Sequence, residues 1–136
     1  MPSRDSQTVN RIDVAGSTAL GDAVAAMRRY AVDQGLAPTH QARLCIIVEE
    51  LITNMIEHGG GERRIGLQLD RQGDAVRVAI EDDGPAFDPR DFADSAIPER
   101  GGGAGLRLVR IWAESIAYQS SGGRNRLELF VPLKAE

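Results

Sequence analysis

The sequence predicts an α+β fold, a two-layer sandwich in which helices lie on a mixed, mostly antiparallel sheet. Two observations predict it. Apolar residues recur every three or four positions across two stretches of the first half, which indicates amphipathic helices. Apolar and polar residues alternate in paired segments further along, and turn formers join the members of each pair. Helices interspersed with hairpins favour an antiparallel sheet that is covered on one face.

The size and composition are those of one ordinary domain. The 136 residues, 42% hydrophobic and 26% charged, are expected to form a single domain over 1–136, with a buried core and a frayed segment at 1–7. The net charge of -4 gives no overall basic footprint, so we expect no direct nucleic-acid partner and no anionic membrane. No apolar run suits a bilayer and no leader opens the chain, so a cytoplasmic location is expected.

The first half of the chain predicts one strand and two helices. A weak alternation over 8–14 predicts an edge strand. Ser17 is the expected N-cap of the first helix, which Gly35 ends. The second helix is expected to begin at Pro38, to run to about Glu57 and to stop at the following glycines.

The second half predicts two hairpins separated by an irregular stretch and one helix. Residues 65–69 and 76–80 alternate on either side of the turn "RQGD", and two more strands are expected near 115–120 and 126–131. The stretch 83–104 holds three prolines and four glycines without a sustained period, which is typical of a functional lid or binding loop. A helical pattern resumes from Gly105 to about Ala113.

Three polar residues of the second helix form one stripe. Asn54 and His58 lie about 40° and 80° around the helix from Glu50, at the border of the apolar arc, while Glu49 falls on the other side and is expected to be solvated. One interpretation is a solvated helix edge with a histidine near the helix C-terminus. The other is a cleft lined by a carboxylate, an amide and an imidazole.

Asp82 follows the apolar residues of its strand at a spacing of two, so its side chain is expected on the same, inward face. A strand end with a tight turn explains Gly84 and Pro85, but it does not explain an acid that points to the covered face, where an unpaired carboxylate is costly. Such an acid needs a buried donor, and the exocyclic amine of a nucleobase would serve.

The run "GGGAGL" at 101–106 leads into a helix. Glycines let the backbone approach a phosphate, and the helix start offers free N–H groups, although flexible loops also contain such runs. The run fits neither a P-loop nor a dinucleotide fingerprint, and the chain has no zinc-type Cys/His cluster. Taken in order, the helix stripe, the inward aspartate and the glycine run supply a metal ligand, a base reader and a phosphate cradle. Together they predict a nucleotide site.

The sequence resembles the GHKL group of ATP-binding proteins. "EELITNMIEH" resembles the N box of that group, "EDDGPAFDP" its first glycine box and "GGGAGL" its second. Within the group, the chain is most similar to the bacterial anti-sigma factor serine-protein kinases, and the likeness extends from about residue 8 to residue 133. The resemblance implies a Bergerat-type ATP-binding fold.

Carried over by position, the resemblance implies roles for individual residues. Asn54 would hold Mg²⁺ on the ATP phosphates, Asp82 would bind the adenine amine, and Glu50 would act as general base. One departure concerns the first glycine box, where Ala86 stands in place of a glycine. Ala86 is therefore expected to alter lid geometry or nucleotide affinity. The remaining implied ATP-binding residues are His58, Gly84, Ala86, Phe87, Gly101, Gly102, Gly103, Ala104, Gly105 and Leu106.

The resemblance implies a function and partners. The expected activity is an ATP-dependent serine/threonine protein kinase that phosphorylates a small anti-anti-sigma antagonist, restrains a sigma factor and forms a homodimer. A non-catalytic, ATP-gated binding module, with Glu50 merely structural, is the main alternative. The catalytic part of a two-component histidine kinase is less favoured, because no room remains for the helical hairpin that carries the phosphoacceptor histidine.

Overall fold

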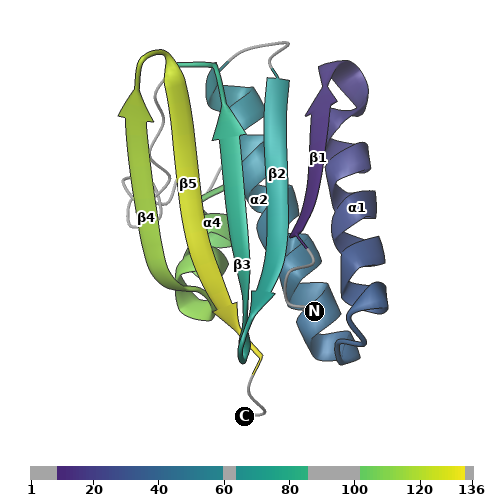
Figure 1. Ribbon diagram of the computed structural model, residues 1–136. Coiled ribbons are helices and arrows are strands. Elements are labelled where there is room, and N and C mark those ends of the chain that lie inside the picture. The colour runs from purple at the N-terminus through teal and green to yellow at the C-terminus, as the bar shows by residue number, and fades with distance from the viewer. Residues whose placement is uncertain (1–8, 60–63, 86–101, 134–136) are drawn as a thin grey trace.

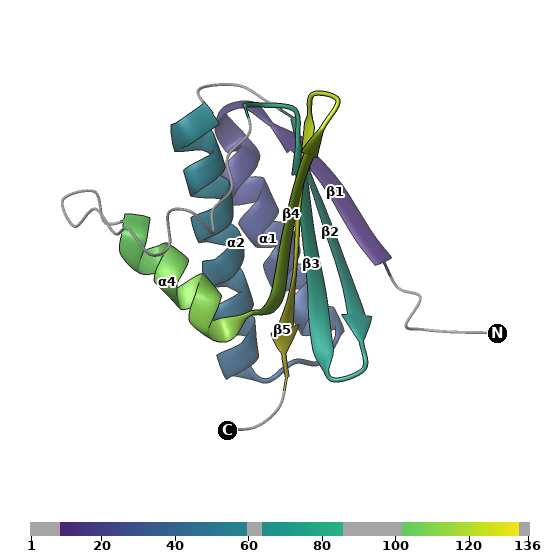
Figure 2. The ribbon, with the colours of Figure 1, turned by 90° about the vertical axis from the view of Figure 1, so that its left-hand side faces the viewer.

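The protein consists of a helix layer packed on one face of a five-stranded sheet. The computed structural model describes residues 9–59, 64–85 and 102–133. Figure 1 shows the sheet in front of the helices, and Figure 2 shows the two layers edge-on. The predicted sandwich is therefore confirmed. The elements are β1 (Val9–Ala15), a 3₁₀ turn (Gly16–Thr18), α1 (Ala19–Asp33), α2 (Pro38–Gly59), β2 (Arg64–Gln72), β3 (Ala75–Asp82), α4 (Gly102–Trp112), β4 (Glu114–Ser121) and β5 (Arg124–Pro132).

The sheet has the strand order β1-β2-β3-β5-β4. All four pairings between the described strands are antiparallel, where the sequence left room for a mixed sheet. The two predicted hairpins are β2–β3 and β4–β5, and the turn residues Gly73, Gly122 and Gly123 have positive φ, as tight hairpin turns require. The central strand, β3, pairs with β2 on one side and β5 on the other, so its C-terminal end at Asp82 lies between two other strand ends.

Two helix starts differ from the prediction. Ser17 is not the N-cap of α1, because it lies in the 3₁₀ turn and Thr18 takes the cap position. The Thr18 hydroxyl donates to the Asp22 carboxylate at 2.9 Å instead of capping the backbone. Helix α4 begins at Gly102 rather than at Gly105, so the glycine run forms its first turn. The predicted end of α1 is confirmed, since Gly35 has φ +67° and comes directly after the C-cap residue, Gln34.

The core lies between the helices and the covered face of the sheet. The predicted apolar arc of α2 is confirmed, because Ile47, Val48, Leu51 and Met55 are all buried. They pack against the inward side chains of the central strands, and burial of such side chains supplies most of the stability. Cys45 is half-buried, and burial raises the pKa of its thiol. No described helix is both long and apolar enough to cross a membrane.

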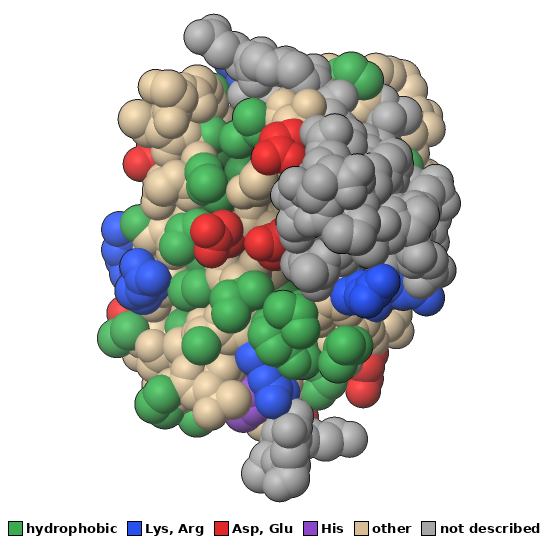
Figure 3. Space-filling model, turned by 180° about the vertical axis from the view of Figure 1, so that it is seen from behind, with side chains coloured by type: hydrophobic (Ala, Val, Ile, Leu, Met, Phe, Trp, Pro, Cys, Tyr) green, Lys and Arg blue, Asp and Glu red, His purple; other side chains and the backbone are tan. Residues whose placement is uncertain are grey.

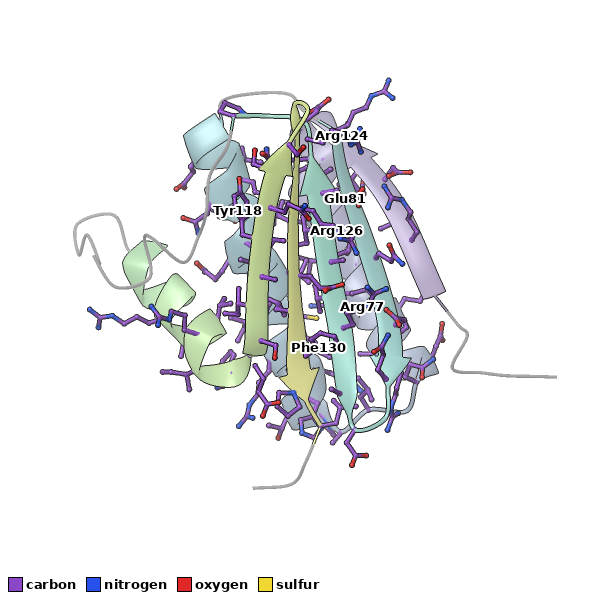
Figure 4. All side chains as sticks on the ribbon, turned by 60° about the vertical axis from the view of Figure 1, so that its left-hand side comes forward. Arg77, Glu81, Tyr118, Arg124, Arg126 and Phe130 are labelled. Atoms are coloured by element: carbon purple, nitrogen blue, oxygen red, sulfur yellow. The ribbon has the colours of Figure 1, made fainter. Side chains whose placement is uncertain are left out.

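The open face of the sheet carries ion pairs that link neighbouring strands (Figure 4). Arg77 of β3 donates from Nε to Asp70 of β2 at 2.9 Å, and from Nη1 to Glu128 of β5. The hydrogen bond to Asp70 raises the pKa of the Arg77 guanidinium. The Asp70 side chain is only 7% exposed although it stands on the open face. Arg77 therefore neutralises a nearly buried carboxylate.

Replacing Arg77 with leucine is expected to destabilise the fold, because Asp70 would lose its counter-charge. We expect the free energy of unfolding to fall by about 3 kcal/mol, as for a broken buried ion pair. Arg11→Leu is the matched control, since its side chain is 39% exposed and pairs with the exposed Asp13. The control should cost less than about 1 kcal/mol. Urea unfolding measures the free energy of unfolding of both variants. An equally small loss in the two would show that water replaces Arg77 around Asp70.

Candidate functional site

The candidate site lies where the helix layer meets the C-terminal end of β3. Helix α2 contributes Glu50 and Asn54, and β3 contributes Asp82 at its last position. Helix α4 packs against α2, so the helix that begins with the glycine run lies beside the helix that carries the polar stripe (Figure 2). The fold therefore places the predicted stripe, the strand end and the glycine helix in one region of the molecule.

Asn54 is a buried amide with a defined orientation. Only 4% of the residue is exposed, and its Nδ2 donates to the backbone oxygen of Glu50, one turn earlier, at 2.7 Å. Since an amide nitrogen only donates, Oδ1 is the atom of the Asn54 side chain that can accept a hydrogen bond or ligate a cation. This hydrogen bond within the helix thus fixes the orientation of the Asn54 amide.

Glu50 is half-buried on the same stripe, whereas Glu49 is exposed as predicted. Burial raises the pKa of the Glu50 carboxyl, and the negative charges of Glu49 and Glu57 raise it further. Acidic side chains gather among apolar ones on this side of the molecule (Figure 3). A carboxylate whose proton affinity is raised in this way is better suited to take up a proton than an ordinary surface glutamate.

Asp82 is buried as its parity predicts, with 4% of the residue exposed. The structure supplies a protein donor that the sequence did not reveal: Nδ2 of Asn125, on β5, donates to Asp82 Oδ1 at 2.7 Å. Asn125 stands directly across from Asp82 in the β3–β5 register and is equally buried. Its inward parity, two residues before the buried Leu127, is the signal that could have identified it.

Asn125 also holds the turn that follows Asp82. Its Nδ2 lies 2.9 Å from the carbonyl oxygen of Gly84 and 3.3 Å from that of Pro85. Its Oδ1 accepts from the hydroxyl of Ser120 at 2.6 Å and from that of Tyr118 at 3.3 Å. Tyr118 lies on the helix side of β4 (Figure 4). The two hydroxyls and the three oxygen acceptors fix which way the amide points.

Part of the predicted site lies outside the described residues. Ala86, Phe87 and Gly101 fall there, as does most of the stretch 83–104 that was expected to be a lid. The backbone of Gly102, Gly103, Ala104, Gly105 and Leu106 forms the start of α4. His58 belongs to the last turn of α2, and the position of its side chain is not described.

The described residues fit an ATP–Mg²⁺ complex. Magnesium prefers oxygen ligands and usually takes only one or two from the protein, with the rest from phosphates and water, and the side-chain oxygen of Asn54 is a ligand of that kind. Among the described residues no cluster of three His, Cys, Asp or Glu side chains could hold a metal unaided, and a site of this kind needs none. The first turn of α4 has free backbone N–H groups, as every helix start does, and such groups suit a phosphate.

The two-layer fold, the helix stripe and the strand-end aspartate are the arrangement of the GHKL class of ATP-binding domains. A family model described as the histidine kinase-like ATPase domain matches residues 15–130, most of the chain. The chain belongs to this family, and membership implies ATP binding.

Individual relatives agree with the family assignment. The chain is 32% identical over 94 residues to the serine/threonine-protein kinase BtrW of Bordetella bronchiseptica, a match that covers 63% of this chain and 66% of BtrW, slightly under two thirds. In structure it is similar to the SiaB–SiaC complex from Pseudomonas aeruginosa, with a TM-score of 0.62 and 17% identity over 88% of each chain. The catalytic domain of histidine kinase ThkA shares the fold, with a TM-score of 0.54 and 15% identity over 91% of this chain and 96% of that domain.

The raised pKa of Glu50 predicts a gain in stability on neutralising it. A carboxyl group whose pKa is raised by folding contributes stability below its unfolded pKa and loses it as the pH rises through the folded value. Glu50→Gln should therefore raise the melting temperature at pH 7.5 by about 1–3 °C and leave it unchanged near pH 4. Glu114→Gln, at an exposed strand start, is the control and should have no such effect. A lower melting temperature at pH 7.5 would contradict the assigned environment of Glu50.

Proposed function

We propose that the protein is an ATP-dependent serine/threonine protein kinase of a partner-switching system. The single observation that carries this proposal is Glu50: an ionisable, half-buried carboxyl group with a raised pKa, one helical turn from the buried Asn54 amide. A purely ATP-gated binding module needs the residues that bind the base and the phosphates. It does not need an acidic side chain at a position where ionisation is unfavourable. The proposed activity is supported by the likeness to BtrW, which is named a serine/threonine-protein kinase.

In this mechanism each residue has a separate task. Asp82 accepts a hydrogen bond from the exocyclic amine of adenine and thereby sets the position of the base. Asn54 would hold Mg²⁺ through Oδ1, and the ion would supply neutralisation of the phosphate charge, while the N–H groups at the start of α4 would orient the phosphates. Glu50 accepts the proton of the acceptor serine or threonine as the hydroxyl oxygen bonds to the γ-phosphorus of ATP and ADP leaves with the bridging oxygen.

Glu50→Gln should separate phosphoryl transfer from ATP binding, because glutamine keeps the shape of glutamate but cannot take a proton. We expect nearly normal ATP affinity and phosphorylation of the partner at least about tenfold slower, a conservative part of the range for general-base catalysis. The wild-type rate should rise with pH through the raised pKa of Glu50, since only the ionised base is active. That rising limb should be absent in the variant. Transfer of radiolabelled phosphate from ATP to a purified antagonist measures the rate of each protein and its dependence on pH.

The matched control for this experiment is Glu49→Gln, which removes an equal charge from the adjacent, exposed position. It should transfer phosphate within about threefold of the wild type, because solvent-exposed charges act weakly on the site. A Glu50→Gln variant with wild-type rate and pH profile would remove Glu50 from the mechanism. A wild-type protein that binds ATP but transfers no phosphate to any partner would favour the binding-module alternative.

The proposed phosphoacceptor is a small anti-anti-sigma antagonist, and a sigma factor is the proposed restrained partner. The chain shares its fold with a chain of the SiaB–SiaC complex, a complex of two proteins, and that likeness is compatible with a protein partner. The family resemblance further leads us to propose a homodimer. Sedimentation at micromolar concentration should then give about twice the monomer mass of 14.7 kDa, and a species of monomer mass alone would contradict this.

A further inference from the structure

Asn125 is held so that its amide nitrogen faces Asp82. Nδ2 lies within hydrogen-bond distance of Asp82 Oδ1 and of the Gly84 carbonyl, at 2.7 and 2.9 Å, and both partners can only accept. On its other side, Oδ1 accepts from the hydroxyl groups of Ser120 and Tyr118. A flipped amide would place its oxygen against two acceptors, so the donor at position 125 is fixed before any ligand arrives.

We infer that Asn125 is the residue that determines the purine specificity of the site, acting through position 82. This inference rests on the proposed function, in which Asp82 meets the edge of the base. A fixed donor at Asn125 requires an acceptor on the facing atom of residue 82. A carboxylate meets that requirement with one oxygen, and under the proposed function the base meets its other oxygen, which is also an acceptor. Such a surface selects a purine that carries an amino group at C6, and it rejects one that carries an oxygen there.

The same geometry predicts how an amide would behave at position 82. In Asp82→Asn, the new side-chain oxygen would turn to the Asn125 donor, and the new NH₂ group would face the ligand. That donor opposes the amino group of adenine but matches the C6 oxygen of hypoxanthine. The variant is therefore expected to prefer the hypoxanthine nucleotide over the adenine nucleotide. If Asn125 and Asp82 had a merely structural role, the variant would instead bind both nucleotides more weakly and to the same degree.

The experiment compares the affinities for ATP and inosine triphosphate, each with Mg²⁺, by calorimetry. The two nucleotides have bases of equal size and differ at the C6 and N1 positions. Wild-type protein should prefer ATP. In Asp82→Asn the ratio of the two affinities should fall by about a hundredfold, since one favourable contact is lost and another gained. Ser120→Ala is the control: it removes one donor to Asn125 Oδ1 but none of the Nδ2 contacts, so the ratio should stay within about threefold of wild type.

Two double variants test whether Asn125 is the cause. The exchange Asp82→Asn with Asn125→Asp places an acceptor at 125, which should attract the NH₂ group of residue 82 and restore the preference for ATP, even if absolute affinity stays low. Asp82→Asn with Asn125→Ala leaves the amide free to turn, so the two nucleotides should bind within about threefold of each other. The ratio is informative because a general loss of affinity cancels from it.

An exchange variant that fails to regain the ATP preference would overturn the inference and leave the proposed function intact. Wild-type ATP binding with an unchanged affinity ratio in Asp82→Asn would overturn the inference and also remove Asp82 from base recognition, while the proposed kinase activity and the role of Glu50 would stand. A wild-type protein that binds neither nucleotide would instead refute the proposed function. The fixed donor has its own test in the wild-type protein without nucleotide, so it does not depend on any variant folding. The Asn125 side-chain NH₂ should give slowly exchanging proton signals in NMR spectra, and exchange as fast as that of an exposed asparagine would exclude a fixed donor.

Discussion

The hydrogen bond from Asn125 to the buried Asp82 carboxylate is the interaction on which the candidate site depends. Asp82 points into the covered face of the sheet because it follows three inward apolar residues at a spacing of two, and a buried carboxylate without a donor is strongly unfavourable. Asn125 provides that donor from the neighbouring strand. The antiparallel register thus makes the polar strand end compatible with the core that surrounds it.

The second constraint is the position of a polar stripe beside the apolar arc of α2. Leu51 and Met55 bury one side of the helix, while Glu50 and Asn54 lie on its border. One N–H group of the Asn54 amide is satisfied within the helix, which lowers the cost of burying that side chain. Burial raises the pKa of the Glu50 carboxyl, and two neighbouring acids raise it further. The helix therefore gives up stability at Glu50 in the ionised form, a cost that proteins commonly accept at functional sites.

The sequence predicts most of this architecture because the relevant signals are local. Periods of two and of about 3.6 residues define the strands and helices, and Gly35 and Gly73 mark two of their ends through positive φ. The predicted N-cap, Ser17, lies one residue before the observed cap, Thr18, because a 3₁₀ turn precedes α1, as is frequent at helix N-termini. Asn125 was missed for a different reason. Its partner lies 43 positions away, and only the strand register, which periodicity does not specify, brings the two together.

The hydrogen bonds of Asn125 also hold the turn that follows Asp82, at the start of the segment that resembles the first glycine box. In this protein the carbonyl groups of Gly84 and Pro85 are both within reach of the Asn125 amide, and the ring of Pro85 restricts its own φ. The turn up to Pro85 is thus held by a side chain from β5 and by a proline. Under the proposed function, this part of the turn is therefore preorganised beside Asp82 before the base binds.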